Sequence, residues 1–192
     1  ENAIEALSMF NDLTNKYMVS PPSVTTYSWN EAQDAFLTGK ASQVVLGSAP
    51  IYSFISGEHD DMNWGACLIP KGPNGTDYAS FSGGDSIGIT SQCENVDAAW
   101  DFIEYSLSEE VQVDELAKGG LLPARSDFFD NEYFNSTPEY QVLREALEVG
   151  HTPVSLKYDE MYVPILEAMQ NCLNGEISPE EAFKTAAEEI DK

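Results

Sequence analysis

This 192-residue chain has few basic residues, few cysteines and only two histidines, and each shortage removes a class of function. It carries 9 Lys and Arg against 33 Asp and Glu, which gives a formal net charge of −24. A field of that sign repels nucleic acid and anionic membrane surfaces, so no nucleic-acid partner is expected. It disfavours anionic ligands and favours cationic ones, whereas neutral solutes are indifferent to it. We expect most of the carboxylates to coat helix surfaces.

The three cysteines predict neither a disulfide framework nor a zinc site. Cys67, Cys93 and Cys172 are odd in number and widely spaced, and no CxxC pair or histidine cluster accompanies them. Cys67 and Cys172 lie in apolar patterns and are expected to be buried as small apolar residues. The acidic run Glu58–Asn63 lacks the glycine and the distal glutamate of an EF-hand loop. We therefore expect no bound metal and no cofactor.

Long apolar runs and catalytic patterns are also missing. No run approaches the roughly 20 residues of a membrane span, and no signal peptide opens the chain. Because Glu1-Asn2-Ala3 leads directly into a helical pattern, we expect the chain to be part of a longer protein. No GxSxG elbow or GxxxxGK[ST] phosphate loop occurs, and His59 and His151 lie in unrelated contexts. We predict that the protein is not an enzyme.

Helical spacing and capping signals account for most of the chain. Apolar residues recur at helical spacing from Ile4 to Tyr17, and two prolines then end the pattern. Ser28 with Glu31 has the spacing of a capping box. Other predicted helices are 48–55, the segments after Asn95 and Ser108, the segments behind Thr137-Pro138 and Ser178-Pro179, and 159–173.

Short apolar runs between the helices predict strands. These runs are Gln43–Leu46, Trp64–Ile69 and Ser86–Thr90. Single strands that alternate with more numerous helices predict an α/β architecture with a partly parallel sheet. Trp100 lies in the apolar stripe of the helix after Asn95 and is predicted to be in the core. Trp29 and Trp64, near loop boundaries, are also interpreted as structural.

A series of short motifs runs along the whole chain in a fixed order. They include FxxGKA at Phe36–Ala41, the pair Gly83-Gly84, AAWxFIEY at Ala98–Tyr105 and GxxP at Gly120–Pro123. Each motif is short, but their order resembles the C-terminal half of the extracellular solute-binding proteins of ABC importers. The resemblance is to the carbohydrate-binding group that includes the maltose-binding protein. It implies a type II periplasmic-binding-protein-like fold, in which a hinge joins two α/β lobes and this fragment comprises mostly the C-terminal lobe.

The resemblance also implies how the chain is divided. Residues 1–82 and 123–192 would form two parts of the C-terminal lobe, and residues 83–122 would include the hinge and pack with an absent N-terminal lobe. Without its sheet partners, this middle segment would expose Ile87, Ile89 and one face of the Trp100 helix. We expect the fragment to cover that surface by self-association or swapping.

The function that the resemblance implies is delivery of a solute. The protein would be an extracytoplasmic substrate-binding component that closes on a sugar or oligosaccharide and docks on the ABC permease subunits in the membrane. It would be an extracellular bacterial lipoprotein or a periplasmic protein, with its signal and anchor outside this chain, and the fragment alone would bind sugar weakly or not at all. The acidity also permits a polyamine receptor of the same fold. A secreted glycan-degrading domain, whose acid pair would not stand out among so many acids, and an adhesion module are the alternatives from other classes.

A sugar site needs flat aromatic rings for the C–H faces and a few carboxylates or amides for the hydroxyls. The double glycine Gly83-Gly84 would let backbone approach a ligand, and Asp85 could accept hydroxyl hydrogen bonds, although the same residues suit a plain turn. The resemblance places Tyr162 where sugar-binding relatives commonly carry a stacking aromatic, and Tyr158 lies one turn earlier. Core packing or a position at the solvent edge is the alternative for these tyrosines.

A second candidate segment is the predicted strand-to-helix junction after Gly47. The resemblance places this junction at the cleft, where relatives often carry a tryptophan. Here the positions are Ser48 and Ala49, and Tyr52 is the nearest aromatic. Ser48 and Tyr52 are therefore added to the predicted ligand-binding residues. Arg125 could bind a carboxylate or the hinge backbone, but a surface or structural role is favoured.

Overall fold

The computed structural model describes residues 2–56, 59, 61–72, 74–152, 155 and 157–191. It forms two compact units. The first unit combines the two ends of the sequence, Glu1–Val44 and Pro153–Lys192, and the second is the continuous segment Val45–Thr152. The predicted lobe boundaries differ from these unit boundaries and stay a prediction.

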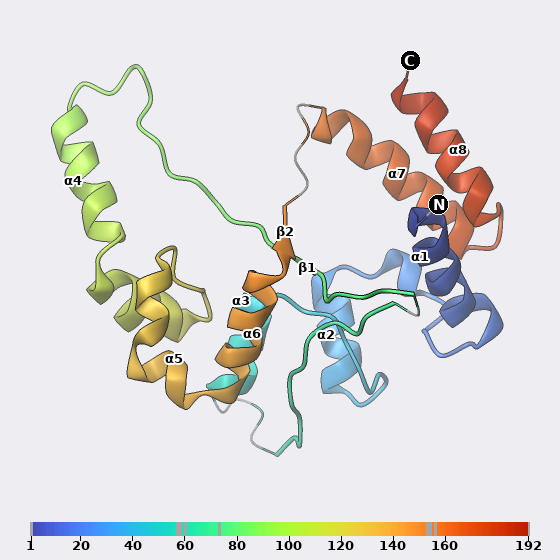
Figure 1. Ribbon diagram of the computed structural model, residues 1–192, viewed down its shortest axis with the longest axis horizontal. Helices are drawn as coiled ribbons and strands as arrows, with labels where there is room; N and C mark the ends of the chain where they lie inside the picture. Colours follow the sequence, from blue (N-terminus) through green and yellow to red (C-terminus); the bar gives the residue numbers. More distant parts are fainter. Residues whose placement is uncertain are drawn as a thin grey trace. The chain divides into compact units, whose positions relative to one another are not determined.

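The first unit is a helical body built around three helices: α1 (Asn2–Asn11), α7 (Tyr158–Leu173) and α8 (Pro179–Ile190). The α7 and α8 helices lie side by side, and α1 packs against both (Figure 1). Their small facing side chains allow close approach, and the core consists of Leu7, Ala168, Cys172, Ala182 and Ala186. The elements are α1 (Asn2–Asn11), the π-helical turn Asp12–Lys16, the 3-10 turn Val24–Thr26, α2 (Trp29–Leu37), α7 (Tyr158–Leu173) and α8 (Pro179–Ile190).

The predicted capping signals are found at the starts of α2 and α8. Ser28 and Glu31 form a complete capping box, in which the side chain of each contacts the backbone N–H of the other. At α8, the Ser178 Oγ accepts a hydrogen bond of 3.2 Å from the Glu181 backbone N–H. These caps satisfy backbone donors that have no partner inside the first turn of a helix, which is why the predicted starts are confirmed.

The second unit is built around an aromatic core beneath α6. The rings of Phe129, Phe134 and Tyr140 are buried together, and Phe134 and Tyr140 meet edge to face with centroids 5.1 Å apart. The elements are α3 (Ser48–Ile55), β1 (Ser80–Phe81), α4 (Val96–Ser106), the π-helical segment Glu110–Leu116, the 3-10 turns Ala117–Gly119 and Ser126–Asp130, α5 (Glu132–Ser136), α6 (Pro138–Glu148) and β2 (Gly150–His151).

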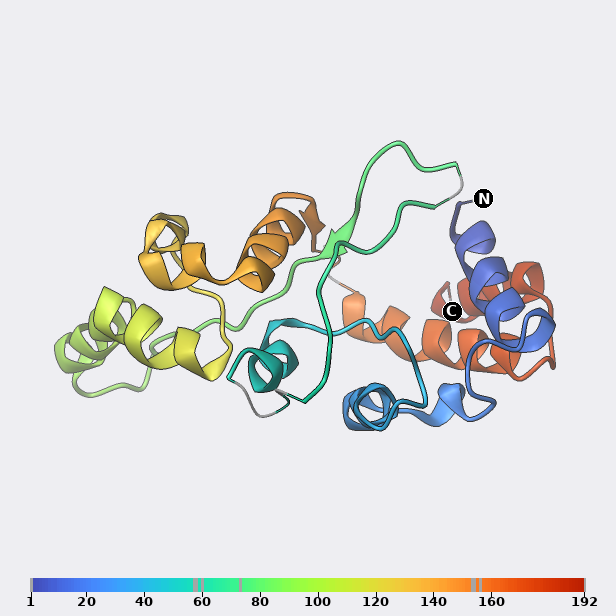
Figure 2. The same cartoon turned by 90° about the horizontal axis from the view of Figure 1, so that it is seen from below.

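The strands differ from the sequence-based expectation. In the described part of the chain, β1 and β2 form one parallel pair, with Ser80 opposite Gly150 and Phe81 opposite His151. The predicted strands Gln43–Leu46, Trp64–Ile69 and Ser86–Thr90 are wrong, because all three are irregular. The last of them lies in the light green stretch of chain between β1 and α4, which are labelled in Figure 1, and is seen from below in Figure 2. A strand exists only where a second backbone supplies hydrogen bonds, and no described segment pairs with these three runs.

Burial also corrects two predictions about apolar side chains. Cys172 is buried as predicted, and that burial raises the pKa of its thiol. Cys67 is exposed, because it lies with Gly65 and Ile69 on the exposed side of its run, whereas the alternate residues Trp64, Ala66 and Leu68 are half-buried. Trp100 is 54% exposed, and the buried residue of α4 is instead Ile103. The described residues form no helix that is long and apolar enough to cross a membrane.

Candidate ligand-binding site

Two exposed tyrosines stand one above the other at the start of α7. The Tyr158 and Tyr162 rings are four residues apart, so the helix places them on one face. Their centroids are 6.2 Å apart and their planes are inclined by 32°. Tyr158 is 42% and Tyr162 52% exposed, so the core packing considered for them from the sequence is not what the structure shows. The pair offers two aromatic faces to solvent.

The first turn of α7 also carries exposed carboxylates: Asp159 is next to Tyr158, and Glu160, two residues after Tyr158, lies on the opposite side of the helix. Asp159 and Glu160 are exposed, and the Lys157 Nζ lies 3.7 Å from the Glu160 carboxylate. Pro164 lies inside the helix and has no N–H to donate to the Glu160 carbonyl, four residues earlier. The two rings therefore share one face of the helix with the Asp159 carboxylate beside it, and Glu160 lies outside this group. This combination can stack on an apolar ring face and accept hydrogen bonds from hydroxyls.

The second pair of candidates, Ser48 and Tyr52, lies on α3 in the other unit. Gly47 is the N-cap residue in extended conformation, and Ser48 is the first residue of the helix, as predicted. Ser48 and Tyr52 are one turn apart and both are half-buried. Part of the Tyr52 side chain is occupied in packing, because its Cβ lies against the backbone of Gly120.

The candidates Gly83, Gly84 and Asp85 follow β1 in the irregular segment that was predicted to begin a strand. A side chain at position 83 would overlap the ring of Phe81, whose Cε1 lies 2.6 Å from the ideal Cβ position. Open space surrounds the corresponding position at Gly84, and Asp85 is exposed. Gly84 is thus the one of these three where another molecule could approach the backbone closely. Their predicted role in ligand binding stays a prediction.

Arg125 binds a carboxylate, but within its own turn. Its Nε and Nη2 donate to the two carboxylate oxygens of Asp127 at 3.1 and 2.6 Å. These hydrogen bonds lower the pKa of Asp127, and the guanidinium also lies 4.6 Å from the centre of the Phe128 ring. The geometry agrees with the structural role that the sequence favoured.

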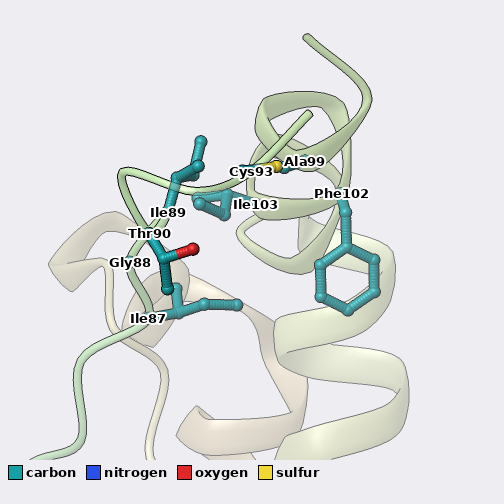
Figure 3. A pocket seen from close by; sticks show the side chains of 8 residues that line it. All are labelled: Ile87, Gly88, Ile89, Thr90, Cys93, Ala99, Phe102 and Ile103. Atoms are coloured by element: carbon teal, nitrogen blue, oxygen red, sulfur yellow. The ribbon is translucent and has the colours of Figure 1, made fainter. Parts of the chain in front are cut away.

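One hollow was not predicted from the sequence. A cavity of about 340 Å³ lies between the segment before α4 and α4 itself (Figure 3). The side chains that line it are almost entirely apolar, and the Thr90 hydroxyl and the Cys93 thiol are their polar groups. Such a lining suits an apolar cover and not the hydroxyls of a sugar. The lining residues are Ile87, Gly88, Ile89, Thr90, Cys93, Ala99, Phe102 and Ile103.

Metal ligands are not gathered anywhere in the described residues. No group of three or more His, Cys, Asp and Glu side chains there could hold an ion. Within the acidic run Glu58–Asn63, Glu58 and Asp60 lie outside the described residues.

A family model described as bacterial extracellular solute-binding protein matches residues 5–113, more than half of the chain. The chain belongs to this family. It is 29% identical over 98 residues to a maltooligosaccharide ABC transporter solute-binding lipoprotein of Streptococcus pneumoniae. The matched region is 51% of this chain and 22% of that protein. The chain is 24% identical over 160 residues to a galactooligosaccharide-binding protein of Bacillus subtilis, which covers 83% of this chain and 37% of that protein.

Solved structures of solute-binding proteins share the fold. A maltose-bound MalE3 of T. maritima superposes with a TM-score of 0.84 at 24% identity, covering 98% of this chain and 49% of that one. The GacH receptor of Streptomyces glaucescens superposes with a TM-score of 0.80 at 26% identity, covering 98% and 47%. The predicted α/β, type II periplasmic-binding-protein-like fold is therefore confirmed. The chain spans about half the length of these structures and a smaller share of the two curated relatives.

Proposed function

We propose that this protein is the extracytoplasmic substrate-binding component of an ABC importer and that its ligand is a sugar or oligosaccharide. The observation that carries the proposal is the exposed Tyr158–Tyr162 pair on one face of α7. The names of the relatives support the ligand class, because they specify maltooligosaccharide, galactooligosaccharide and maltose. The strongly acidic charge is compatible with a neutral ligand.

In the proposed mechanism, the protein binds the sugar reversibly and catalyses no reaction of it. Each tyrosine ring covers an apolar C–H face of the sugar, and the neighbouring Asp159 carboxylate accepts hydroxyl hydrogen bonds. Ser48, Tyr52 and the backbone at Gly83–Asp85, all in the second unit, are proposed as ligand-binding residues in their own right. A ligand that binds the closed form better than the open form shifts the population toward closure.

The remaining parts of the proposal concern the whole protein. Residues 1–82 and 123–192 belong to one lobe, and residues 83–122 pack with the other lobe and include the hinge. The closed, loaded form docks on permease subunits in the membrane, and the protein lies outside the cytoplasm as a lipoprotein or periplasmic protein. It makes and breaks no bond in its ligand.

The test is an NMR titration of this chain with maltotriose and, separately, with spermidine. Because the chain spans about half the length of its solved relatives, we expect a dissociation constant in the millimolar range, about −4 kcal/mol. Maltotriose should shift the resonances of Tyr158 and Tyr162, and Tyr162→Ala should weaken binding about tenfold, or about 1.4 kcal/mol. Tyr17→Ala is the matched control, because Tyr17 is an exposed tyrosine of the same unit.

Three other outcomes would contradict the proposed ligand, the proposed class of protein or the proposed site. Shifts with spermidine and none with maltotriose would replace the sugar with a polyamine. Release of chromophore from chromogenic glycosides, abolished by changing an acid pair, would replace the receptor with a glycan-degrading enzyme. Shifts that leave both tyrosines unmoved would remove the Tyr158–Tyr162 pair from the site.

A further inference from the structure

Gly120 is buried at the point where a helical segment ends in a left-handed turn. Its φ is +85°, and its N–H donates to the Ala117 carbonyl at 2.9 Å. The next N–H, of Leu121, reaches back to the Leu116 carbonyl at 3.0 Å. This pair of bonds is the usual way to close a helix with a left-handed residue, and glycine adopts it without strain.

The helix α3 rests directly on the backbone of this turn. A Cβ added to Gly120 would overlap the Cβ of Tyr52, and it would lie 3.0 Å from the Ala49 carbonyl oxygen and 3.2 Å from Tyr52 Cγ. These atoms are backbone, or the root of a side chain, and no rotamer change moves them away. The absence of a side chain at position 120 therefore determines how closely the first two turns of α3 can approach.

The turn under α3 is itself firmly held. The buried Tyr140 Oη donates to the Ala117 carbonyl at 2.8 Å. The buried Gln112 side chain accepts from the Ala124 N–H and donates to the Ser106 carbonyl, both at 2.7 Å. A Cβ at position 120 would thus push α3, and not the turn, out of place.

We propose that Gly120 is a positioning residue for the ligand-binding residues Ser48 and Tyr52. The inference rests on the proposed function, which includes those two residues among the ligand-binding residues. Gly120 acts through α3. It determines the distance between the first two turns of this helix and the turn Ala117–Gly120. Any side chain at position 120 displaces Ser48 and Tyr52 together.

The chain supplies matched controls for the test. Gly39 and Gly175 also have positive φ, +71° and +79°, but no atom lies within 4 Å of the Cβ that each would gain. Alanine at all three positions introduces the same backbone strain, and only at position 120 does it also introduce the collision. Comparison of Gly120→Ala with Gly39→Ala and Gly175→Ala therefore separates the two effects.

The first measurement is the amide spectrum of each variant. Gly120→Ala should shift the resonances of Ser48, Ala49 and Tyr52, whereas the two controls should leave them in place. Gly120→Asn adds a discriminating variant, because asparagine tolerates a left-handed conformation but still carries a Cβ. Unmoved α3 resonances in Gly120→Ala, or their recovery in Gly120→Asn, would overturn the proposal.

A double variant keeps the test decisive if Gly120→Ala alone unfolds the second unit. Tyr52→Gly removes the Cβ that would collide, so Gly120→Ala should cost less stability in that background than in the wild type. Equal costs in the two backgrounds would contradict the proposal.

Ligand binding by the same variants is measured in a separate experiment. If wild-type chain binds maltotriose, Gly120→Ala should weaken binding at least fivefold and Gly175→Ala should not. If the wild type shows no binding, this chain has no maltotriose site of its own, and the spectra still decide whether Gly120 positions α3.

Discussion

The hydroxyl of Tyr140 donates a 2.8 Å hydrogen bond to the backbone carbonyl of Ala117, 23 residues earlier in the chain. Both residues are almost completely buried, Tyr140 at 1% and Ala117 at 0% exposure. The bond joins α6 to the 3-10 turn that supports α3. Because the carbonyl has no access to water, its hydrogen bond to Tyr140 matters more than one at the surface would.

Removal of this hydroxyl is therefore predicted to destabilise the second unit. Tyr140→Phe keeps the aromatic packing and deletes only the donor, so we expect the free energy of unfolding to fall by about 1–2 kcal/mol. Urea denaturation followed by circular dichroism measures the change. Tyr162→Phe is the control and should stay within about 0.5 kcal/mol of wild type, since Tyr162 is exposed. Equal effects of the two variants would contradict the prediction.

The same tyrosine predicts a loss of stability at alkaline pH. Burial, as the largest cause, raises the pKa of Tyr140 well above its ordinary value of 10.0. Below pH 10 the phenol is protonated in both states, and the fold keeps its full stability. Above pH 10 the unfolded chain releases the proton and the folded chain retains it, so the free energy of unfolding falls by about 1.4 kcal/mol per pH unit.

Denaturation of wild type and Tyr140→Phe between pH 9 and pH 11 measures this loss. The variant has no phenol at this position, so its stability should decline less steeply, by the equivalent of one proton. The raised pKa of Cys172 adds a similar decline to both proteins, and it cancels in the comparison. Parallel curves would show that the Tyr140 pKa is not raised by folding.

Gln112 gives a third prediction, because its amide joins two segments from a buried position. It donates to the Ser106 carbonyl and accepts from the Ala124 N–H, both at 2.7 Å. Gln112→Leu keeps the volume and leaves both backbone groups without this partner, so we expect a loss of about 2–4 kcal/mol in the free energy of unfolding. Glu115→Gln, at an exposed position of the same segment, should change little. Thermal unfolding of the two variants at equal concentration decides the point, and comparable melting temperatures would refute it.

Local signals explain why many helices could be predicted. The capping box of Ser28 and Glu31 and the N1 proline Pro179 act within one turn, so the sequence contains everything that they need. The spacing of Tyr158 and Tyr162 likewise predicts that they share one face of α7. The spacing could not predict that they are exposed, because the same stripe could serve core packing, and their role in binding stays a prediction.

Features that depend on a distant partner could not be predicted. Ser86–Thr90 has the composition of a strand, but no described backbone pairs with it. Trp100 lies in the apolar stripe of α4, yet periodicity identifies a face without saying whether anything covers it. The approach of Tyr52 to Gly120 joins residues far apart in the sequence, and no local pattern signals it.

The exposed aromatic side chains of α4 give the last prediction, that this chain associates with itself in solution. Trp100 and Phe102 are 54% and 62% exposed, and Phe102 lines the apolar cavity of Figure 3. Burial of such a surface is favourable by roughly 25 cal/mol per Å² of apolar area, so two copies gain by covering it. The net charge of −24 opposes association at long range, and salt screens that repulsion. Association should therefore strengthen as ionic strength rises.

Sedimentation velocity at two salt concentrations, together with binding of a dye that reports exposed apolar surface, tests this expectation. The variant Trp100→Gln with Phe102→Gln should sediment closer to a monomer and bind less dye than wild type. Trp29→Gln is the control, because Trp29 is just as exposed but belongs to α2 in the other unit. A wild-type chain that is a single monomeric species at both salt concentrations, with no dye bound, would show that the α4 face does not drive association. Equal loss of association in Trp29→Gln would place the contact elsewhere.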